Sequence, residues 1–496
     1  MQLTNWFQSV FRSRDARVSL AGVLLIAVVV SLLGGLLVAL LGGLISLGLL
    51  VGVLFGLWVL RDIDVGFVAL IAAICLLPFG ALPVNVGFKP TFLDLVVVAL
   101  FGVWLAQRVG GRQGKLIGVP IGLPVLIFLA LALATFVAGL GHAPLTQTVA
   151  RHFAEVVLSI LLFFMVVDTV RDEARLAKFA RVVMIAGFLA SLIAIVLYVL
   201  PDRTTMDLLS RLRVFGYPEG PGVLRFIRDD PSLPQRATGT SVDPNVLGGL
   251  LIMTLSIGVA QAFGARPILR RRWTWPIVAT MAVALVLTFS RGSFLGAGVA
   301  LLGLGVLRYR RLLPLLALAV VVILALPQTQ DYVKHFFEGL QGEDLATQMR
   351  FGEYRDALTL IGRYPILGVG FTGAPDLGTY IGVANVYLLM AQEMGLVGLG
   401  AFLLVMLTLF GWGWQARRAV RAGPRLEAMW WGLHAALAGA LVGGVFDHYF
   451  FNLDFHHSVA FFWLLVGLAA SATRLALHPA DARTGPVRAK ELDSRL

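Results

Sequence analysis

IGVANVYLLMAQEMGLVGLGAFLLVMLTLFGWG, residues 381–413, is a 33-residue apolar run in which Glu393 is the single charged side chain. A helix needs roughly 20 apolar residues to cross a bilayer core of about 30 Å. Runs of similar character recur from end to end of the 496-residue chain, which is 58% hydrophobic and 14% charged. Soluble domains average about 25% charged residues. The sequence therefore predicts an all-α polytopic membrane protein whose helices form one bundle.

The apolar runs predict about 12–14 transmembrane helices. We place them at residues 19–40, 42–60, 65–83, 91–107, 117–139, 152–169, 179–200, 242–264, 274–290, 293–307, 312–327, 381–413, 428–446 and 456–473. Residues 1–17 are expected to form a cytoplasmic amphipathic N-terminus, residues 18–474 the bundle, and residues 475–496 a disordered cytoplasmic tail. The 293–307 run is short enough to be re-entrant.

Basic residues predict the orientation of the bundle, because loops rich in Lys and Arg stay in the cytoplasm. With the N-terminus inside, each dense basic cluster falls in a cytoplasmic connection: Arg61; Arg108, Arg112 and Lys115; Arg171, Arg175 and Lys178; Arg266 and Arg270 to Arg272; Arg308, Arg310 and Arg311; Arg417, Arg418, Arg421 and Arg425. This placement accounts for the net charge of +12 and argues against a nucleic-acid partner. Residues 201–241 and 327–380 then become the two long extracytoplasmic loops.

The longer of these loops, residues 327–380, is the longest polar interruption in the chain. Within it, Met349–Ile361 has the spacing of an amphipathic helix, with Arg350 at its start. The apolar stripe predicted for this helix consists of Phe351, Tyr354, Leu358 and Ile361. Tyr364-Pro365 is expected to end the helix, and Gly368 and Gly370 to allow a tight turn. The segment is either a lid on the membrane surface or a packed surface helix.

Two further arginines lie where outer loops meet hydrophobic runs. Arg236 precedes Asp243-Pro-Asn245, which is expected to cap a helix and to leave N–H groups facing an anion. Arg291 lies in a turn between two runs. Guanidinium groups that lie at the same depth in the membrane can each donate two hydrogen bonds to the oxygens of a diphosphate. The alternative for Arg236 is a side chain that extends to the membrane surface beside an ordinary helix cap. The alternative for Arg291 is a residue that anchors its span at the membrane interface.

The stretch from Asp447 to His457 concentrates two carboxylates and three imidazoles in eleven positions. Such a cluster can supply a general base. A metal site is the weaker interpretation, because nothing in the spacing fixes a ligand geometry. An aromatic belt with polar tips at the membrane interface is another. The single cysteine, Cys75, lies in an apolar run and is expected to be a core residue. The chain also has no nucleotide-binding fingerprint, so we predict neither metal nor cofactor.

Four ordered motifs resemble those of the O-antigen ligase and O-antigen polymerase superfamily. They are Arg236…Gly239…Asp243-Pro-Asn245, then Ser290-Arg-Gly292, then Arg350 with Pro365…Gly368-Val-Gly370, then Asn385-Val-Tyr-Leu-Leu389…Glu393-Met-Gly395. Together with the Asp447 region they span about half the chain. The N-terminal half matches only as a series of hydrophobic spans.

This resemblance implies an inverting, metal-independent glycosyltransferase with a GT-C-like fold. The donor would be an undecaprenyl-pyrophosphate-linked glycan and the acceptor a hydroxyl of a glycan or lipid-linked molecule. The enzyme would lie in the bacterial cytoplasmic (inner) membrane, with its active site on the extracytoplasmic side. By motif position, Arg236, Arg291 and Arg350 would bind the pyrophosphate, and Asn245, Asn385 and Tyr387 would contact substrate.

One departure from the family pattern concerns the base. Ligases of the family carry a histidine immediately before the asparagine of the Asn-x-Tyr-Leu stretch, and this sequence has Ala384 there. The resemblance places Asp447 where the family has an acidic residue near the last spans, with His448 beside it. Asp447 is the predicted base or base-orienting group, and Glu393 is the second candidate. The departure favours a polymerase or a divergent ligase.

Two functions from other classes compete with the enzyme. A flippase for lipid-linked oligosaccharides also has many spans, but a transporter is expected to carry charges near the bilayer midplane and repeated halves with broken helices. A lipid pyrophosphate phosphatase is expected to show His and Arg phosphate motifs, which are not evident.

Overall fold

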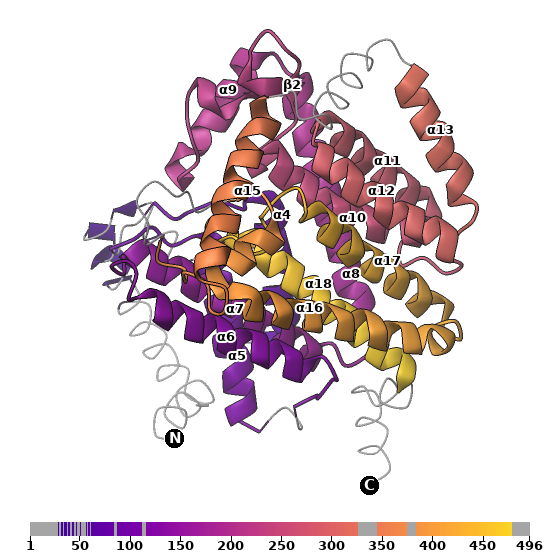
Figure 1. Ribbon diagram of the computed structural model, residues 1–496, viewed down its shortest axis with the longest axis horizontal. Coiled ribbons are helices and arrows are strands. Elements are labelled where there is room, and N and C mark those ends of the chain that lie inside the picture. The colour runs from indigo at the N-terminus through magenta and orange to yellow at the C-terminus, as the bar shows by residue number, and fades with distance from the viewer. Residues whose placement is uncertain are drawn as a thin grey trace, which may run out of the picture.

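The computed structural model describes residues 61–83, 87–111, 116–325, 345–373 and 383–478, with scattered positions between 28 and 59. This part of the chain is a helical bundle (Figure 1). Its long helices are α4 (Ile63–Leu76), α5 (Phe92–Val109), α6 (Gly122–Gly139), α7 (Gln147–Thr169), α8 (Glu173–Val199), α10 (Pro244–Phe263), α11 (Arg271–Leu287), α12 (Arg291–Leu307), α13 (Leu312–Ala325), α15 (Leu345–Arg363), α16 (Val386–Val420), α17 (Pro424–Gly443) and α18 (His456–Leu477).

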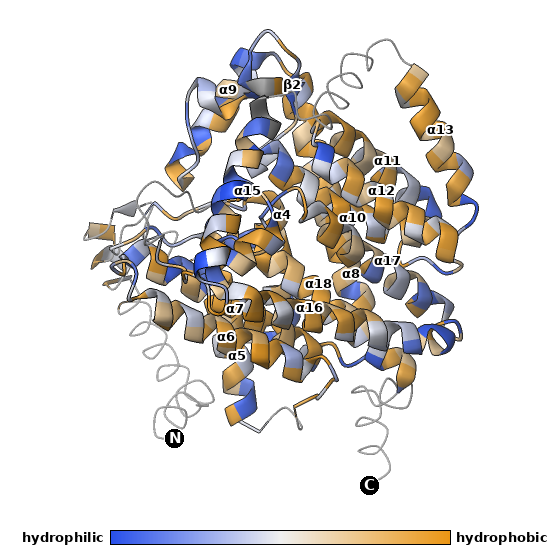
Figure 2. Cartoon of the chain, in the orientation of Figure 1, coloured by the Kyte–Doolittle hydropathy of each residue, from blue (hydrophilic) through white to orange (hydrophobic). Residues whose placement is uncertain are grey.

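Each hydrophobic run predicted from residue 65 onward coincides with a helix. Seven helices of the described part are long and apolar enough to cross a membrane, and α4, α12 and Leu312–Val322 of α13 are shorter apolar helices. Figure 2 shows the apolar residues along these helices, whereas α15 and the short α9 (Asp202–Ser210) are largely polar. The protein is therefore an all-α polytopic membrane protein. The predicted N-terminus, most of the first two spans and residues 479–496 lie outside the described residues.

The centre of the bundle is formed by α10, α17 and α18. The apolar windows of α10 and α18 are 94% and 100% buried, whereas only 28% of α5 is. α10 packs against α11, α12 and α17, and α18 packs against α7. Gly296 of α12 and Gly439 of α17 allow those helices to approach, since a Cβ at either position would lie within 2.8 Å of the other's backbone oxygen. Cys75 is buried in α4, as expected for a core residue.

Contacts between helix ends follow the alternation that the basic residues predict. Arg308 at the end of α12 binds Glu427 at the start of α17, with 2.7 Å between Nε and Oε1. Lys178 of α8 binds Asp64 at the start of α4 at 2.8 Å. Arg474 of α18 donates to the Val170 carbonyl at 2.5 Å. The helix ends in these three contacts all lie on the side that the basic clusters predict to be cytoplasmic. We call this side the basic end. The ends carrying the four motifs form the opposite, motif end.

The long polar loop contains the predicted helix, but only Tyr354 and Ile361 of the predicted apolar stripe are partly buried. α15 begins at Leu345, so Arg350 lies in its second turn, and the helix ends at Arg363 before Tyr364-Pro365. Its buried face carries Ala357 and Leu360, while Phe351 and Leu358 are 56% and 59% exposed. The packed face is thus rotated from the predicted one.

A two-stranded sheet and a helix in the shorter loop were not predicted. β1 (Arg225–Phe226) pairs antiparallel with β2 (Gln235–Arg236), with Arg225 opposite Arg236. Strands of two residues are too short to produce a periodic pattern in the sequence. The sheet fixes the backbone of Arg236 as the chain returns to the bundle.

α16 is broken near its start. Gly395 has φ 68° and ψ −179°, outside the helical region. The loop after α15 fills the break: the N–H groups of Val369 and Gly370 donate to the carbonyls of Gln392 and Glu393 at 2.9 Å, and the Leu396 N–H donates to the Pro365 carbonyl at 2.8 Å. Gly368 and Gly370 adopt φ of 67° and 79°, which confirms the predicted turn.

Candidate active site

Residues 444–452, the loop between α17 and α18, form the meeting point of the motif end. Phe446 packs on Gly292 at the start of α12, and Tyr449 packs on Gly249 near the start of α10. The Val386 N–H at the start of α16 is shared between the carbonyls of Gly444 and Asp447, at 2.8 and 3.1 Å. The loop between α17 and α18 therefore also contacts the starts of three other helices, α10, α12 and α16.

Asp447 occupies a recess in this loop. Its side chain keeps some exposed surface although protein surrounds it on most sides, and burial raises the pKa of Asp447 to about 7. The Tyr449 hydroxyl and the His448 N–H both donate to its carboxylate, and Arg350 acts on it electrostatically. Burial also raises the pKa of Tyr449 well above its usual value and lowers that of His448. Asp447 thus titrates near neutral pH, the range in which a general base is most effective.

Two residues of α15 place Arg350 beside this recess. Glu353 Oε2 accepts a 3.0 Å hydrogen bond from the Ala384 N–H. The Tyr354 hydroxyl reaches the Ala384 carbonyl at 3.5 Å. Position 384, where the family histidine is missing, therefore serves through its backbone as the attachment point of α15. Arg350, one turn before Tyr354, lies close enough to Asp447 and Tyr449 to act electrostatically on both.

Arg236 joins two of the motifs. Its Nε donates to the Thr288 carbonyl at 2.8 Å and one terminal nitrogen donates to Asn245 Oδ1 at 2.7 Å. Asp243 caps α10 by accepting from the Asn245 N–H at 2.7 Å, as predicted. Arg291 begins α12, in the turn that follows Thr288, and is half-buried. The structure thus gives Arg236 a positioning role at the junction of α10, α11 and α12.

Asn385 and Tyr387 connect the start of α16 to the end of α17. Asn385 Oδ1 caps α16 by accepting from the N–H groups of Tyr387 and Leu388, at 2.9 and 3.0 Å. Its Nδ2 donates to the Val445 carbonyl at 2.9 Å, and the Tyr387 hydroxyl donates to the Leu441 carbonyl at 2.7 Å. These contacts hold the Asp447 loop in place. The predicted contacts of both residues with substrate remain predictions.

Glu393 lies apart from the Asp447 recess, in a second cavity of about 270 Å³ between α7, α16 and the 452–454 segment. His152, Asn452 and Asp454 also line this cavity. The two regions are connected, since Asn452 Nδ2 lies 3.0 Å from Nδ1 of His448. The two alternative candidates for the base, Asp447 and Glu393, therefore lie in two neighbouring sites.

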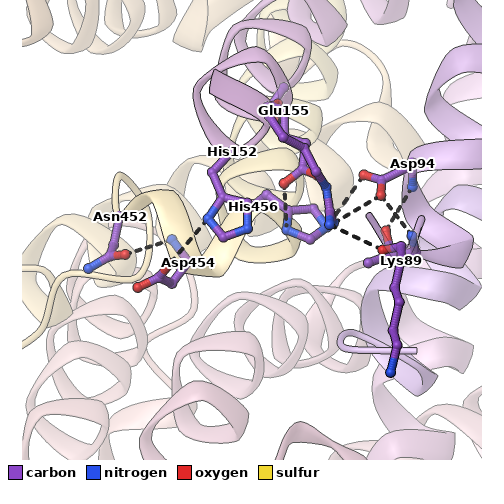
Figure 3. A network of polar contacts seen from close by, with 10 residues as sticks. Lys89, Asp94, His152, Glu155, Asn452, Asp454 and His456 are labelled. Atoms are coloured by element: carbon purple, nitrogen blue, oxygen red, sulfur yellow. Dashed lines mark hydrogen bonds and ion pairs between the residues drawn. The ribbon is translucent and has the colours of Figure 1, made fainter. Parts of the chain in front are cut away.

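A polar network behind this cavity was missed by the sequence analysis (Figure 3). Arg151 binds Glu155 Oε1 at 2.7 Å and Asp94 Oδ2 at 3.3 Å, and Glu155 Oε2 lies 3.2 Å from Nδ1 of His456. His152 binds Asp454 at 3.2 Å. The signal available in the sequence was the group Arg151, His152 and Glu155 at the start of a hydrophobic run.

The same network contains the group of described residues best suited to a metal ion. Ligand atoms of Asp94, Glu155 and His456 lie within 4.8 Å of one another. Arg151 already neutralises both carboxylates, however, which favours an ion-pair network over a cation site. His457, the neighbouring imidazole, instead packs against the Phe79 ring at 4.7 Å. The absence of a metal requirement remains a prediction.

Comparison with known protein families gives a match that includes part of the motif end. Residues 276–403 match the family described as O-antigen ligase. The chain carries an O-antigen ligase domain. The match covers about a quarter of the chain, from α11 to the middle of α16, and no curated protein matches the sequence. The domain supports the resemblance to the O-antigen ligase and polymerase superfamily, and with it an enzyme of glycosyltransferase or ligase type that acts on lipid-linked glycans in a membrane.

The O-antigen ligase domain includes part of the candidate site. The predicted residues within it are Arg291, Arg350, Asn385, Tyr387 and Glu393; those outside it are Arg236, Asn245, Asp447 and His448. The contacts described above join the two sets, because Arg236 binds Thr288 and the Asp447 loop binds Val386. Residues on both sides of the domain boundary therefore form one motif end.

Proposed function

We propose that the protein transfers a glycan from undecaprenyl pyrophosphate to an acceptor hydroxyl on the extracytoplasmic side of the bacterial inner membrane. The observation that carries the proposal is the juxtaposition of Arg350 with Asp447, a cation beside a carboxylate whose pKa is near 7. A glycosyl transfer of this kind needs both: positive charge for the departing diphosphate and a base for the acceptor. The motif end is assigned outside because the basic clusters occupy the other end.

The proposed reaction is a single displacement with inversion. The acceptor oxygen forms a bond to the anomeric carbon, the bond from that carbon to the pyrophosphate oxygen breaks, and its electron pair stays on the leaving diphosphate. The hydroxyl proton passes to Asp447. Arg350 and Arg291 face the charge that develops on the leaving group, while Arg236 supports the helix starts around it. Positive groups held in place before the reaction favour such a transition state.

The broken helix α16 is a feature that transporters also show. Transporters bind ions and substrates at the unwound parts of discontinuous helices. In this protein, backbone N–H groups of the loop after α15 donate hydrogen bonds to the carbonyl groups at the break. The break is therefore filled by protein, and the transferase is the function that the described residues support best.

Asp447→Asn is expected to reduce turnover by about 100- to 10,000-fold, the range for loss of a general base, with a smaller effect on donor binding. Asp447 acts as a base only when deprotonated, so wild-type turnover should rise with pH through about 7. The variant should lose that rise. The measurement is the pH dependence of single-turnover transfer in proteoliposomes. The exposed Asp207→Asn on α9 is the control, and unchanged turnover in Asp447→Asn would place the base elsewhere.

Chelation is expected to leave transfer unchanged, since arginines supply the positive charge in the proposed mechanism. The experiment compares initial rates before and after dialysis against excess EDTA. A loss of activity that divalent cations restore would contradict metal independence. The His456→Ala variant would then show whether the Asp94, Glu155 and His456 group holds the ion.

A further inference from the structure

The proposed reaction assigns no role to the cavity beside Glu393. Its volume of about 270 Å³ lies just below the roughly 300–1,000 Å³ of small-molecule sites. Polar side chains of Glu393, His152, Asn452 and Asp454 share its wall with the apolar Phe371 and Leu389. Such a lining suits a ligand with hydroxyl groups at its edge and an apolar face.

Glu393 provides the observation that points to a ligand. Its side chain is 5% exposed, and Oε2 has no hydrogen-bond partner among the described residues. Buried polar atoms nearly always have a partner, so a carboxylate that lines a cavity and keeps one oxygen without a partner is a candidate acceptor for a donor from outside the protein. A hydroxyl group is such a donor.

Three other residues of the cavity lining, Asn452, Asp454 and His152, are joined by hydrogen bonds (Figure 3). Asn452 Oδ1 accepts from the Asp454 N–H at 2.8 Å, and Asp454 Oδ1 binds Nδ1 of His152 at 3.2 Å. The pair of Asp454 and His152 presents both an acceptor and an imidazole to the cavity. Together with Glu393, these groups give the cavity several acceptors and donors for the hydroxyls of a sugar ring.

The cavity is also suitably placed relative to the Asp447 recess. Asn385, Leu389 and Glu393 follow at intervals of four residues and therefore share one face of α16. At 1.5 Å per residue, Glu393 lies about 12 Å along the helix from Asn385. The residue after Asn385 is hydrogen-bonded to the Asp447 loop. The cavity therefore lies within the length of a short glycan from Asp447.

We propose that this cavity is a carbohydrate subsite that binds one pyranose ring of the glycan substrate, with a ring hydroxyl donating to Glu393. The inference rests on the proposed function for the identity of the glycan, but not for the binding itself. The sugar comes either from the acceptor or from the lipid-linked donor, and the subsite supplies affinity and specificity rather than chemistry.

The test is ligand-observed NMR on the purified protein in nanodiscs, with a panel of methyl glycosides of glucose, galactose and N-acetylglucosamine. At least one glycoside should bind, and Glu393→Gln should weaken it at least tenfold. Thr148→Trp, an exposed position at the cavity edge, should block binding without replacing a polar group. Glu219→Gln, on the exposed surface, should leave it unchanged. Thermal unfolding of each variant confirms that it is folded.

Absence of binding to every glycoside, or equal binding by wild type and by folded Glu393→Gln and Thr148→Trp variants, would overturn the proposal. Transfer assays then distinguish the source of the sugar: a raised KM for acceptor alone assigns the subsite to the acceptor, and a raised KM for donor alone assigns it to the donor. The subsite proposal and the transferase proposal can fail independently, because glycoside binding is measured without lipid pyrophosphate.

Discussion

Arg350→Ala should lower glycan transfer by about 100- to 1,000-fold, the loss typical of removing one preorganised group that stabilises a leaving charge. The variant removes the cation that acts on Asp447 while leaving the two contacts of α15 with Ala384 intact. Expression and thermal stability should therefore stay near wild type. The measurement is the initial transfer rate in proteoliposomes with a lipid-pyrophosphate-linked glycan.

Arg355→Ala is the matched control for this prediction. Arg355 belongs to the same helix but is exposed, and it is not among the charges that act on Asp447. Its replacement removes an equal charge from α15 and should change the rate less than twofold. Equal losses in the two variants would show that the net charge of the helix matters rather than the position of Arg350.

Gly395→Ala should have the largest effect on folding. A Cβ at this position would lie 2.0 Å from the carbonyl oxygen of Ile366, and φ of 68° is unfavourable for any residue with a side chain. A clash and a strained dihedral each cost roughly 1–3 kcal/mol, so the expected destabilisation is about 2–6 kcal/mol. The measurements are membrane yield and thermal unfolding followed by tryptophan fluorescence.

Gly400→Ala separates the clash from the loss of a helical glycine. Gly400 also lies in α16, and a Cβ there would meet no atom within 4 Å. Alanine at this site should be neutral or stabilise the helix by up to about 1 kcal/mol. Wild-type stability in Gly395→Ala would mean that the loop after α15 does not enter the break in α16.

The sequence alone predicted the helices well and their mutual contacts poorly. The apolar runs are long, so twelve of the predicted spans coincide with helices. The spacing also located α15, but not which of its faces is packed, because Phe351 and Leu358 are exposed and the small Ala357 is buried instead. Hydrophobicity identifies an apolar stripe, whereas the buried face depends on which neighbours the fold places beside the helix.

The motifs were recognisable before their physical roles were. Gly368, Gly370 and Gly395 belong to two separate motifs, and the structure explains both by one close contact between a loop and a broken helix. Asn385 and Arg236 were expected to bind substrate, yet their described contacts hold helix ends. The network of Arg151 and Glu155 was missed because its partners come from helices far apart in the sequence.

The central claim is that cations at the motif end bind a lipid diphosphate, and binding itself tests it most directly. Native mass spectrometry of the protein with equal amounts of undecaprenyl pyrophosphate and undecaprenyl phosphate compares the two lipids in one sample. We expect a clear preference for the pyrophosphate in wild type and in Arg355→Ala, and its loss in Arg350→Ala. Equal binding of both lipids by wild type, or an unchanged preference in Arg350→Ala, would contradict the account.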